Sequence, residues 1–278
     1  MKRILILTDF SENAWNAVAY AMAFYKDKPV TYILAHISPP GEAFPLEETF
    51  ASYVTGKPLK SNIDVYDLDA LKKKMLKHSH LKERQIEVAH WEANFADGSK
   101  RMAKQQDIDL IVMGTKGRSD SKNEVIGGHA RTVITKIKYP VMIIPEEATF
   151  RVPLNIAFPT DYDFIYKEKV LNVLSEIVNV HRSNLNVLRV ANSRLPLSPF
   201  QKKNRGCLND FFKSPSVSFH RVNQPDLEYG IQSFIDSMNI DMVAMVAKNL
   251  NFFQKLLFNS RVIKMSYHLS VPFLVLHE

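Results

Sequence analysis

The strongest constraint on this chain is that its sequence repeats. Residues 107–145 align without a gap with residues 239–277, at a constant offset of 132. Residues 4–24 and 155–177 also share a pattern, because each is a short apolar run that ends in Thr-Asp and precedes an amphipathic helical segment. Self-similarity of this kind indicates two copies of one folding unit.

Each copy has the pattern of strands that alternate with helices. We expect one domain at residues 1–148 and another at 149–278, joined around residues 145–153. The expected strands are residues 4–7, 31–37, 86–90, 110–113 and 141–145 in the first copy, and 156–158, 185–190, 217–222, 242–246 and 273–277 in the second. Parallel neighbours need a long crossover, and near-continuous Val/Ile/Leu strands are typical of a sheet covered on both faces. The predicted class is α/β: two tandem doubly wound domains, each an open five-stranded parallel sheet with helices on both faces.

The helices are expected between these strands. They are predicted at residues 98–105, 129–137, 229–238 and 261–267, with a charged helical stretch at 68–83. Residues 38–65 and 191–212 are the least regular parts of the two copies. The pairs Thr8-Asp9 and Thr160-Asp161 are good N-cap residues for the helices that follow the first strand of each copy.

Composition narrows the class of protein. The chain has 278 residues, of which 46% are hydrophobic and 23% charged, close to the average of globular proteins. The single cysteine, Cys207, cannot form an internal disulfide and fits a reducing compartment, so we expect a cytoplasmic protein. No apolar run approaches the roughly 18 residues of a membrane-spanning helix. The net charge of +7 favours phosphorylated ligands over nucleic acid, for which the sequence has no zinc-finger or RNA-recognition signature.

Four glycines follow the fourth strand of the first copy. Two residues separate Gly114 from Gly117, and nine separate Gly117 from the pair Gly127-Gly128. Ligands of open parallel sheets sit at this carboxyl edge. Glycines there leave backbone N–H groups able to make a concave anion site, and the helix that starts near Gly128 adds its positive end. A phosphate chain is the occupant that this pattern favours.

Charged residues accompany the loop. Lys116 and Arg118 could supply counter-charge to phosphate, whereas Asp120 and Glu124 would repel it unless a cation lies between. Asp9 closes the first strand at the same edge of the sheet. A carboxylate there can accept hydrogen bonds from an adenine amino group or from ribose hydroxyls, and helix capping alone is the competing interpretation.

Three segments carry a resemblance to a known family. TDFSENA after the first strand, AHI at the end of the second, and DLIVMGTKGRSDSKNEVIGGHA around the glycines resemble the universal stress protein family. The family's nucleotide-binding pattern is Gly, two residues, Gly, nine residues, Gly and then Ser or Thr. The resemblance covers nearly the whole chain, as a tandem two-domain member, and implies the adenine nucleotide alpha hydrolase-like fold. It implies a regulatory protein of the stress response that binds ATP, ADP or AMP, with or without Mg²⁺.

The resemblance also implies roles for individual residues. It assigns Asp9 and Ile37 to the adenine and the nearby ribose, and Met113 and Gly114 to the ribose and the first phosphates. The backbone of the three later glycines would wrap the phosphates. The expected nucleotide-binding residues are Thr8, Asp9, Ile37, Met113, Gly114, Gly117, Arg118, Gly127, Gly128 and His129. One departure is Gly128, which stands where the family has Ser or Thr, so a hydroxyl that could bond phosphate or help hold Mg²⁺ is absent.

The second copy lacks the glycine pattern. Val246, Asn249 and the pair Asn259-Ser260 stand where the first copy has its glycines, so we expect a filled or altered site there. The stretch 252–258 between them is rich in Phe and Leu. Exposed apolar patches of that size usually mark interfaces, so we expect this stretch to face the other copy or another subunit.

Other residues that could take part in catalysis or metal binding have simpler interpretations. The KMSYH segment at 264–268 has no partner motif for nucleotidyl transfer, and His78 and His80 do not share a helix face. His36 is expected to pack beside a pocket, and Asp161 to be structural. We predict no catalytic residue and no metal ligand.

Three classes of function stay open. The preferred class is a regulatory adenine-nucleotide-binding protein without a nucleic-acid or membrane partner. The alternatives are a slow ATPase and a nucleotide-free interaction protein in which both sites have decayed. Family members tend to dimerise through their fifth strands. By that analogy VMIIP and FLVLH are expected to meet within one chain as a pseudo-dimer, and a homodimer is a further possibility.

Overall fold

The structure is a computed structural model that describes residues 1–40, 65–117, 120, 126–191, 196–214, 216–247 and 271–278. Its strands are β1 (Lys2–Leu7), β2 (Val30–Ser38), β3 (Ile86–Glu92), β4 (Leu110–Gly114), β5 (Val141–Ile144), β6 (Asn155–Pro159), β7 (Asn184–Ala191), β8 (Val217–Asn223), β9 (Met242–Val246) and β10 (Phe273–Leu276). Within the described residues these strands form one ten-stranded sheet, in the order β3-β2-β1-β4-β5-β10-β9-β6-β7-β8. The strand order of the first half is therefore repeated, in mirror order, by the second half.

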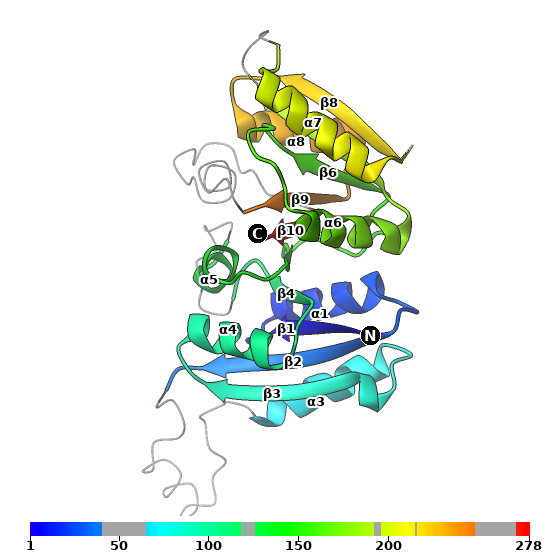
Figure 1. Cartoon of the computed structure of the whole chain (residues 1–278). Coiled ribbons are helices and arrows are strands. Elements are labelled where there is room, and N and C mark those ends of the chain that lie inside the picture. The colour runs from blue at the N-terminus through cyan, green and yellow to red at the C-terminus, as the bar shows by residue number, and fades with distance from the viewer. Residues whose placement is uncertain (41–64, 118–119, 121–125, 192–195, 215, 248–270) are drawn as a thin grey trace, which may run out of the picture.

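The sheet is parallel except at its centre. β5 and β10 pair antiparallel, with Val141 opposite Val275 and Ile143 opposite Phe273. The other neighbouring strands pair parallel, as crossover helices require. The predicted α/β class is confirmed, and so is the expected meeting of the two fifth strands. The difference is that the two five-stranded sheets are continuous across that pair (Figure 1).

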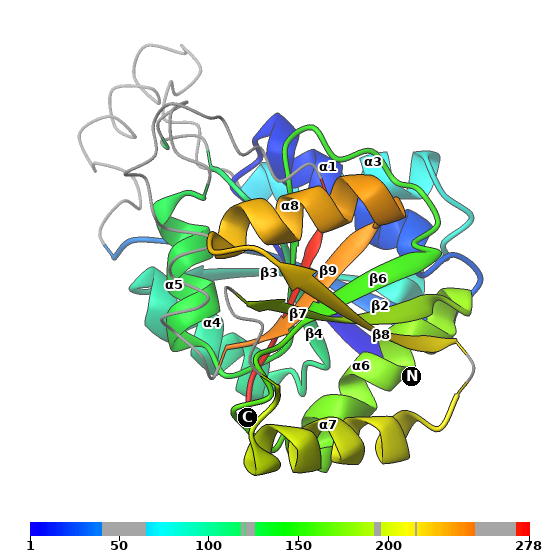
Figure 2. The ribbon, with the colours of Figure 1, turned by 90° about the horizontal axis from the view of Figure 1, so that it is seen from above.

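Helices cover both faces of the sheet. They are α1 (Glu12–Phe24), α3 (Val65–Lys77), α4 (Phe95–Gln105), α5 (Gly128–Lys136), α6 (Glu168–His181), α7 (Pro199–Phe212) and α8 (Leu227–Met238), with a 3₁₀ turn η1 (Glu83–Gln85). Alternate residues of β1 belong to different cores: Ile4 and Ile6 lie in the core on the side of α1, α3, α6 and α7, and Leu5 and Leu7 in the core on the side of α4, α5 and α8. Seen from above, the strands fan out with the twist of the sheet (Figure 2).

Matching contacts after the first strand of each half support the repeat. The Thr8 hydroxyl accepts a hydrogen bond from the Phe10 amide at 3.0 Å, and Thr160 accepts from Tyr162 at the same distance. Phe10 and Tyr162 both have positive φ, 61° and 62°, which is rare for a bulky residue. The same strained turn therefore ends the first strand of each half.

The expected N-caps at Thr8-Asp9 and Thr160-Asp161 are wrong. Ser11 caps α1, and its hydroxyl accepts from the Ala14 amide at 3.1 Å. α6 begins only at Glu168, after Lys167, which makes no side-chain cap. Asp9 and Asp161 instead close the turns before these helices.

Three helix predictions also need correction. α7 occupies a stretch expected to be irregular, because Ser198 and Gln201 form a reciprocal capping box with a proline at the first helical position. α4 begins at Phe95 rather than at residue 98, since Asn94 caps it. α3 ends at Lys77. The expected helix at 261–267 lies outside the described residues, as does most of the segment 38–65. No helix in the described part of the chain is long and apolar enough to cross a bilayer.

Candidate functional site

A cleft opens at the carboxyl ends of β1, β2 and β4, between α4 and α5. Strand order reverses there, because β1 is followed along the chain by β2 on one side and is flanked by β4 on the other. Such switch points are where open α/β sheets bind ligands. The cleft holds about 490 Å³ of space between its walls, a volume that includes the part open to solvent. Seven expected site residues line it: Thr8, Asp9, Ile37, Met113, Gly114, Gly117 and His129.

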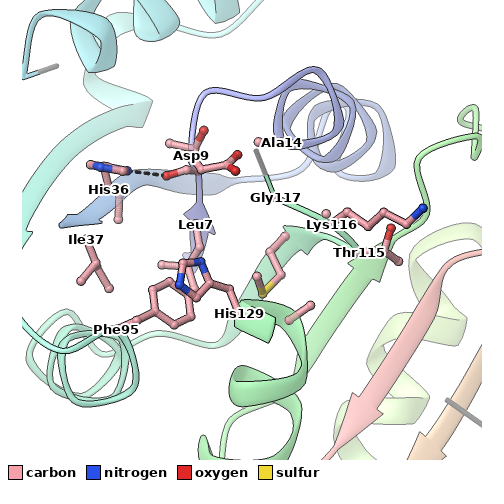
Figure 3. Close-up of a pocket in the computed structure, with 15 residues that line it drawn as sticks. Leu7, Asp9, Ala14, His36, Ile37, Phe95, Thr115, Lys116, Gly117 and His129 are labelled. Atoms are coloured by element: carbon pink, nitrogen blue, oxygen red, sulfur yellow. Dashed lines mark hydrogen bonds between the residues drawn. The ribbon is translucent and has the colours of Figure 1, made fainter. Parts of the chain in front are cut away.

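One wall of the cleft is apolar and aromatic. Ile37 and Met113 are each only 7% exposed and come from the ends of β2 and β4. The Phe95 and His129 rings stack with their centroids 3.9 Å apart and their planes 17° apart (Figure 3). Flat aromatic surface beside aliphatic side chains can hold a planar heterocycle.

The other end of the cleft is polar. Asp9 Oδ1 accepts from the Ser11 amide at 3.1 Å and from the Ser11 hydroxyl at 2.6 Å. His36 Nδ1 lies 2.8 Å from the Thr8 carbonyl, which can only accept, so this nitrogen carries the proton; the bond is the dashed line at His36 in Figure 3. The His36 ring stacks on His90 at 5.8 Å. His36 therefore packs beside the pocket, as expected, and lines it as well.

The Asn13 side chain occupies the space that a side chain at position 114 would need. Its amide nitrogen donates to the Lys116 carbonyl at 3.1 Å and lies 3.3 Å from the Thr115 hydroxyl. A Cβ at Gly114 would lie 2.8 Å from the Asn13 side chain. Gly114 therefore lets the buried Asn13 of α1 tie the end of β4 in place.

The next glycines also lie against side chains of the protein itself. A Cβ at Gly117 would lie 2.7 Å from Asp9 Oδ2, and one at Gly127 would lie 1.7 Å from Asp120 Oδ2. Asp120 accepts hydrogen bonds from the Gly117 amide at 2.7 Å and from the Gly128 amide at 3.1 Å. The amides of Gly117 and Gly128 thus converge on one carboxylate of the protein itself, and we call this pair of amides the anion seat.

The three later glycines of the loop all have partners for their amides within the chain. The Gly127 amide donates to the Thr115 carbonyl at 2.8 Å. The amides of Gly117 and Gly128 point into the seat but already have an anionic partner. Arg118 and Glu124 lie outside the described residues.

In the second half, α7 is hydrogen-bonded to the turn that follows β6. Gln201 of α7 donates to the Asp161 carbonyl at 3.1 Å and to the Asp163 carboxylate at 2.9 Å. Asn204 donates to the Tyr162 carbonyl at 2.7 Å. Asp161 itself accepts from the Asp163 amide at 2.9 Å, in keeping with a structural role. Asn249, Asn259-Ser260 and the segments 252–258 and 264–268 lie outside the described residues.

No metal site is visible in the parts of the chain that the structure describes. There, no three His, Cys, Asp or Glu side chains are grouped to hold an ion. His78 bonds the Lys74 carbonyl at 2.8 Å and packs on Trp15. The contacts of His78 are therefore those of a residue packed on the surface of the protein.

Sequence reasoning missed several residues of the cleft. Ala14, Ala35, Phe95 and Thr115 line it, and Asn13 positions its edge. Two signals were available. Thr115 lies between the first two glycines, and Phe95 directly follows Asn94, a good N-cap, so it opens a helix at the carboxyl edge of the sheet.

Comparisons with known proteins agree with this architecture. The universal stress protein family model matches residues 1–145. A universal stress protein of Methanocaldococcus jannaschii is 25% identical over 154 residues, which are 51% of this chain and 94% of that protein. The crystal structure of a universal stress protein from Archaeoglobus fulgidus has a TM-score of 0.61 at 14% identity, covering 99% of this chain and 96% of that one. A functionally unknown protein from Pseudomonas aeruginosa has a TM-score of 0.60 at 12% identity, covering 100% and 92%. At these identities the two structures show the fold alone.

Proposed function

The chain belongs to the universal stress protein family, and on that premise we propose that the cleft of its first half binds an adenine nucleotide (ATP, ADP or AMP). The observation that carries the proposal is the anion seat: the backbone amides of Gly117, which lines the cleft, and of Gly128, the first residue of α5, converge on one carboxylate. Main-chain donors at a helix N-terminus are typical of phosphate sites. Nucleotide binding would then regulate the protein's part in a stress response.

The apolar wall is the proposed place of the adenine. Ile37 and Met113 offer aliphatic surface, and Phe95 with His129 offers a flat aromatic face. At the polar end, the Asp9 carboxylate could accept from ribose hydroxyls or from the adenine amino group. A mostly apolar wall with a few polar groups that fix the orientation of the ligand is typical of small-molecule sites.

Positive charge for the phosphates is proposed to come from two sources. Lys116 lines the cleft, and its ammonium lies 3.8 Å from the Glu146 carboxylate, a pair weak enough to rearrange. α5 begins at Gly128 and directs its N-terminal end toward the seat. Mg²⁺ could accompany a polyphosphate.

The rest of the chain is assigned by the same proposal. We place the domain boundary between residues 148 and 149, and we infer that the two halves form a pseudo-dimer through the β5–β10 pair. The second half would stabilise the first or contact a partner. The single cysteine supports a cytoplasmic setting.

One observation favours a second candidate, a nucleotide-free interaction protein. Asp120 already accepts hydrogen bonds from the amides of Gly117 and Gly128, so these two amides have an anionic partner without a ligand. Mass spectrometry of small molecules released from freshly purified protein, together with calorimetry against adenosine and AMP, separates the two candidates. If no adenine compound is retained and neither titration gives heat, the second candidate stands.

The experiment that tests the proposed site is an AMP titration of the Phe95→Ala variant. Base–aromatic stacking contributes roughly 1–3 kcal/mol per base, so we expect AMP affinity to fall about fivefold or more. Phe200→Ala is the matched control, since Phe200 is 51% exposed on α7 and should not affect binding. Equal AMP affinity in Phe95→Ala and the wild type would place the base elsewhere.

A further inference from the structure

Asp120 sits where a ligand's anion would sit. Its two carboxylate oxygens accept from the Gly117 amide at 2.7 Å and the Gly128 amide at 3.1 Å. Donors on both oxygens give the carboxylate the same kind of contacts that amides give to phosphate. The anion seat thus offers two backbone N–H donors to one anionic group.

The shape of the seat depends on Gly127. A Cβ at this position would lie 1.7 Å from Asp120 Oδ2 and 2.2 Å from its Cγ, so any side chain would exclude the carboxylate. The φ of Gly127 is −70°, which every residue type adopts. Gly127 therefore serves to leave space, and that space is filled by the Asp120 carboxylate.

Gly117 connects the seat with the cleft. It lines the cleft with its backbone, and its amide points to Asp120. Asp120 is not among the residues that line the cleft. A ligand can therefore occupy the cleft while Asp120 stays seated, but a long anionic tail that reaches the same amides must displace Asp120. Such a tail would also bring negative charge close to a carboxylate, which is unfavourable at short range.

We propose that Asp120 sets the ligand class of this site: it admits adenosine and adenosine monophosphate and disfavours the triphosphate. This inference rests on the proposed function, because it assumes that the cleft binds the adenine end of the ligand. Asp120 acts here as a specificity residue that competes with the outer phosphates for two amides. The apparent affinity for a polyphosphate is the intrinsic affinity multiplied by the fraction of molecules in which Asp120 has left the two amides.

The test is calorimetry of adenosine, AMP and ATP with the full chain at one fixed free Mg²⁺ concentration. In the wild type we expect AMP to bind at least about tenfold more tightly than ATP. Asp120→Ala should tighten ATP binding about tenfold or more and leave adenosine binding within about twofold. Asp210→Ala removes the same charge from an exposed position on α7 and should change none of the three affinities.

Two further variants keep the test decisive. Asp120→Asn is nearly isosteric and should show the same direction of change if Asp120→Ala folds poorly. Asp120→Ala combined with Gly127→Ala puts a Cβ into the seat, so the gain in ATP affinity should disappear while adenosine still binds.

The outcomes distinguish this inference from the proposed function. If adenosine, AMP and ATP all fail to bind every variant, the proposed function is wrong and the inference falls with it. If the wild type binds ATP as tightly as AMP, or if neither Asp120 variant changes the ratio of the two affinities, the proposed function stands and the inference is wrong.

Discussion

At the scale of single residues, the glycines of the loop make room for polar side chains of the same chain. Asn13 lies against Gly114, Asp9 against Gly117, and Asp120 against Gly127. The glycine spacing predicted a place where backbone is approached closely, and that part is confirmed. The partner in each approach could not be predicted, because it depends on which polar side chains the fold brings to this edge.

Gly117→Ala tests this arrangement. Its Cβ would lie 2.7 Å from Asp9 Oδ2, so the Asp9 carboxylate must move, although Ser11 holds its other oxygen. We expect AMP affinity, measured by calorimetry, to fall about tenfold or more, in line with the cost of disturbing a charge-assisted contact. Gly206→Ala is the control, because a Cβ there meets nothing within 4 Å. Unchanged AMP affinity in Gly117→Ala would show that this approach does not shape the ligand site.

At the scale of elements, strands were predicted better than helix starts. Buried strands are continuous apolar runs, and the fourth strand of the second half was predicted at its observed bounds, Met242–Val246. Helix starts depend on single capping residues. Ser11 and Asn94 were overlooked, and Ser198-Pro199 was included in a stretch expected to be irregular. The hydroxyl and amide caps were present in the sequence, but choosing among neighbouring candidates needs the observed backbone.

The cap of α7 gives a test at this scale. Ser198→Ala removes the acceptor that receives the Gln201 amide at 3.1 Å, so we expect a loss of about 1 kcal/mol in the free energy of unfolding. Urea denaturation followed by circular dichroism measures it. Ser198→Asp keeps a side-chain acceptor and should recover most of the loss. If Ser198→Ala is as stable as the wild type, α7 does not depend on this cap.

At the scale of the whole molecule, the β5–β10 pair joins the two halves into one sheet. The repeat in the sequence predicted two similar halves, and both strands of the pair are fully apolar. That these two strands meet was expected only by family analogy, and their antiparallel direction is a finding of the structure. Periodicity and composition describe each unit but not how the two units meet.

His277 directly follows β10, and its titration should make the free energy of unfolding depend on pH. Burial, with a smaller effect of Lys138, lowers the pKa of His277 to about 4. The unfolded chain has an ordinary histidine pKa near 6.5, so between about pH 6.5 and pH 4 it binds a proton that the folded chain does not. The free energy of unfolding should therefore fall as pH drops through this window.

Urea unfolding at pH 7.5 and pH 4.5 measures this effect against His277→Gln. We expect the wild type to lose up to about 2 kcal/mol more than the variant between the two pH values, the size that linkage gives for such a shift. Identical losses in the two proteins would mean that His277 titrates normally in the folded state.

We propose that the cleft of the first half holds the adenine end of a nucleotide beside the anion seat. A crystal structure of the full chain grown with saturating AMP would show the position of the ligand. We expect the base against Ile37 and the Phe95–His129 pair, with the phosphate near Lys116 and the Asp120 carboxylate still on the amides of Gly117 and Gly128. An empty cleft at saturating AMP, or AMP bound at another place, would contradict it.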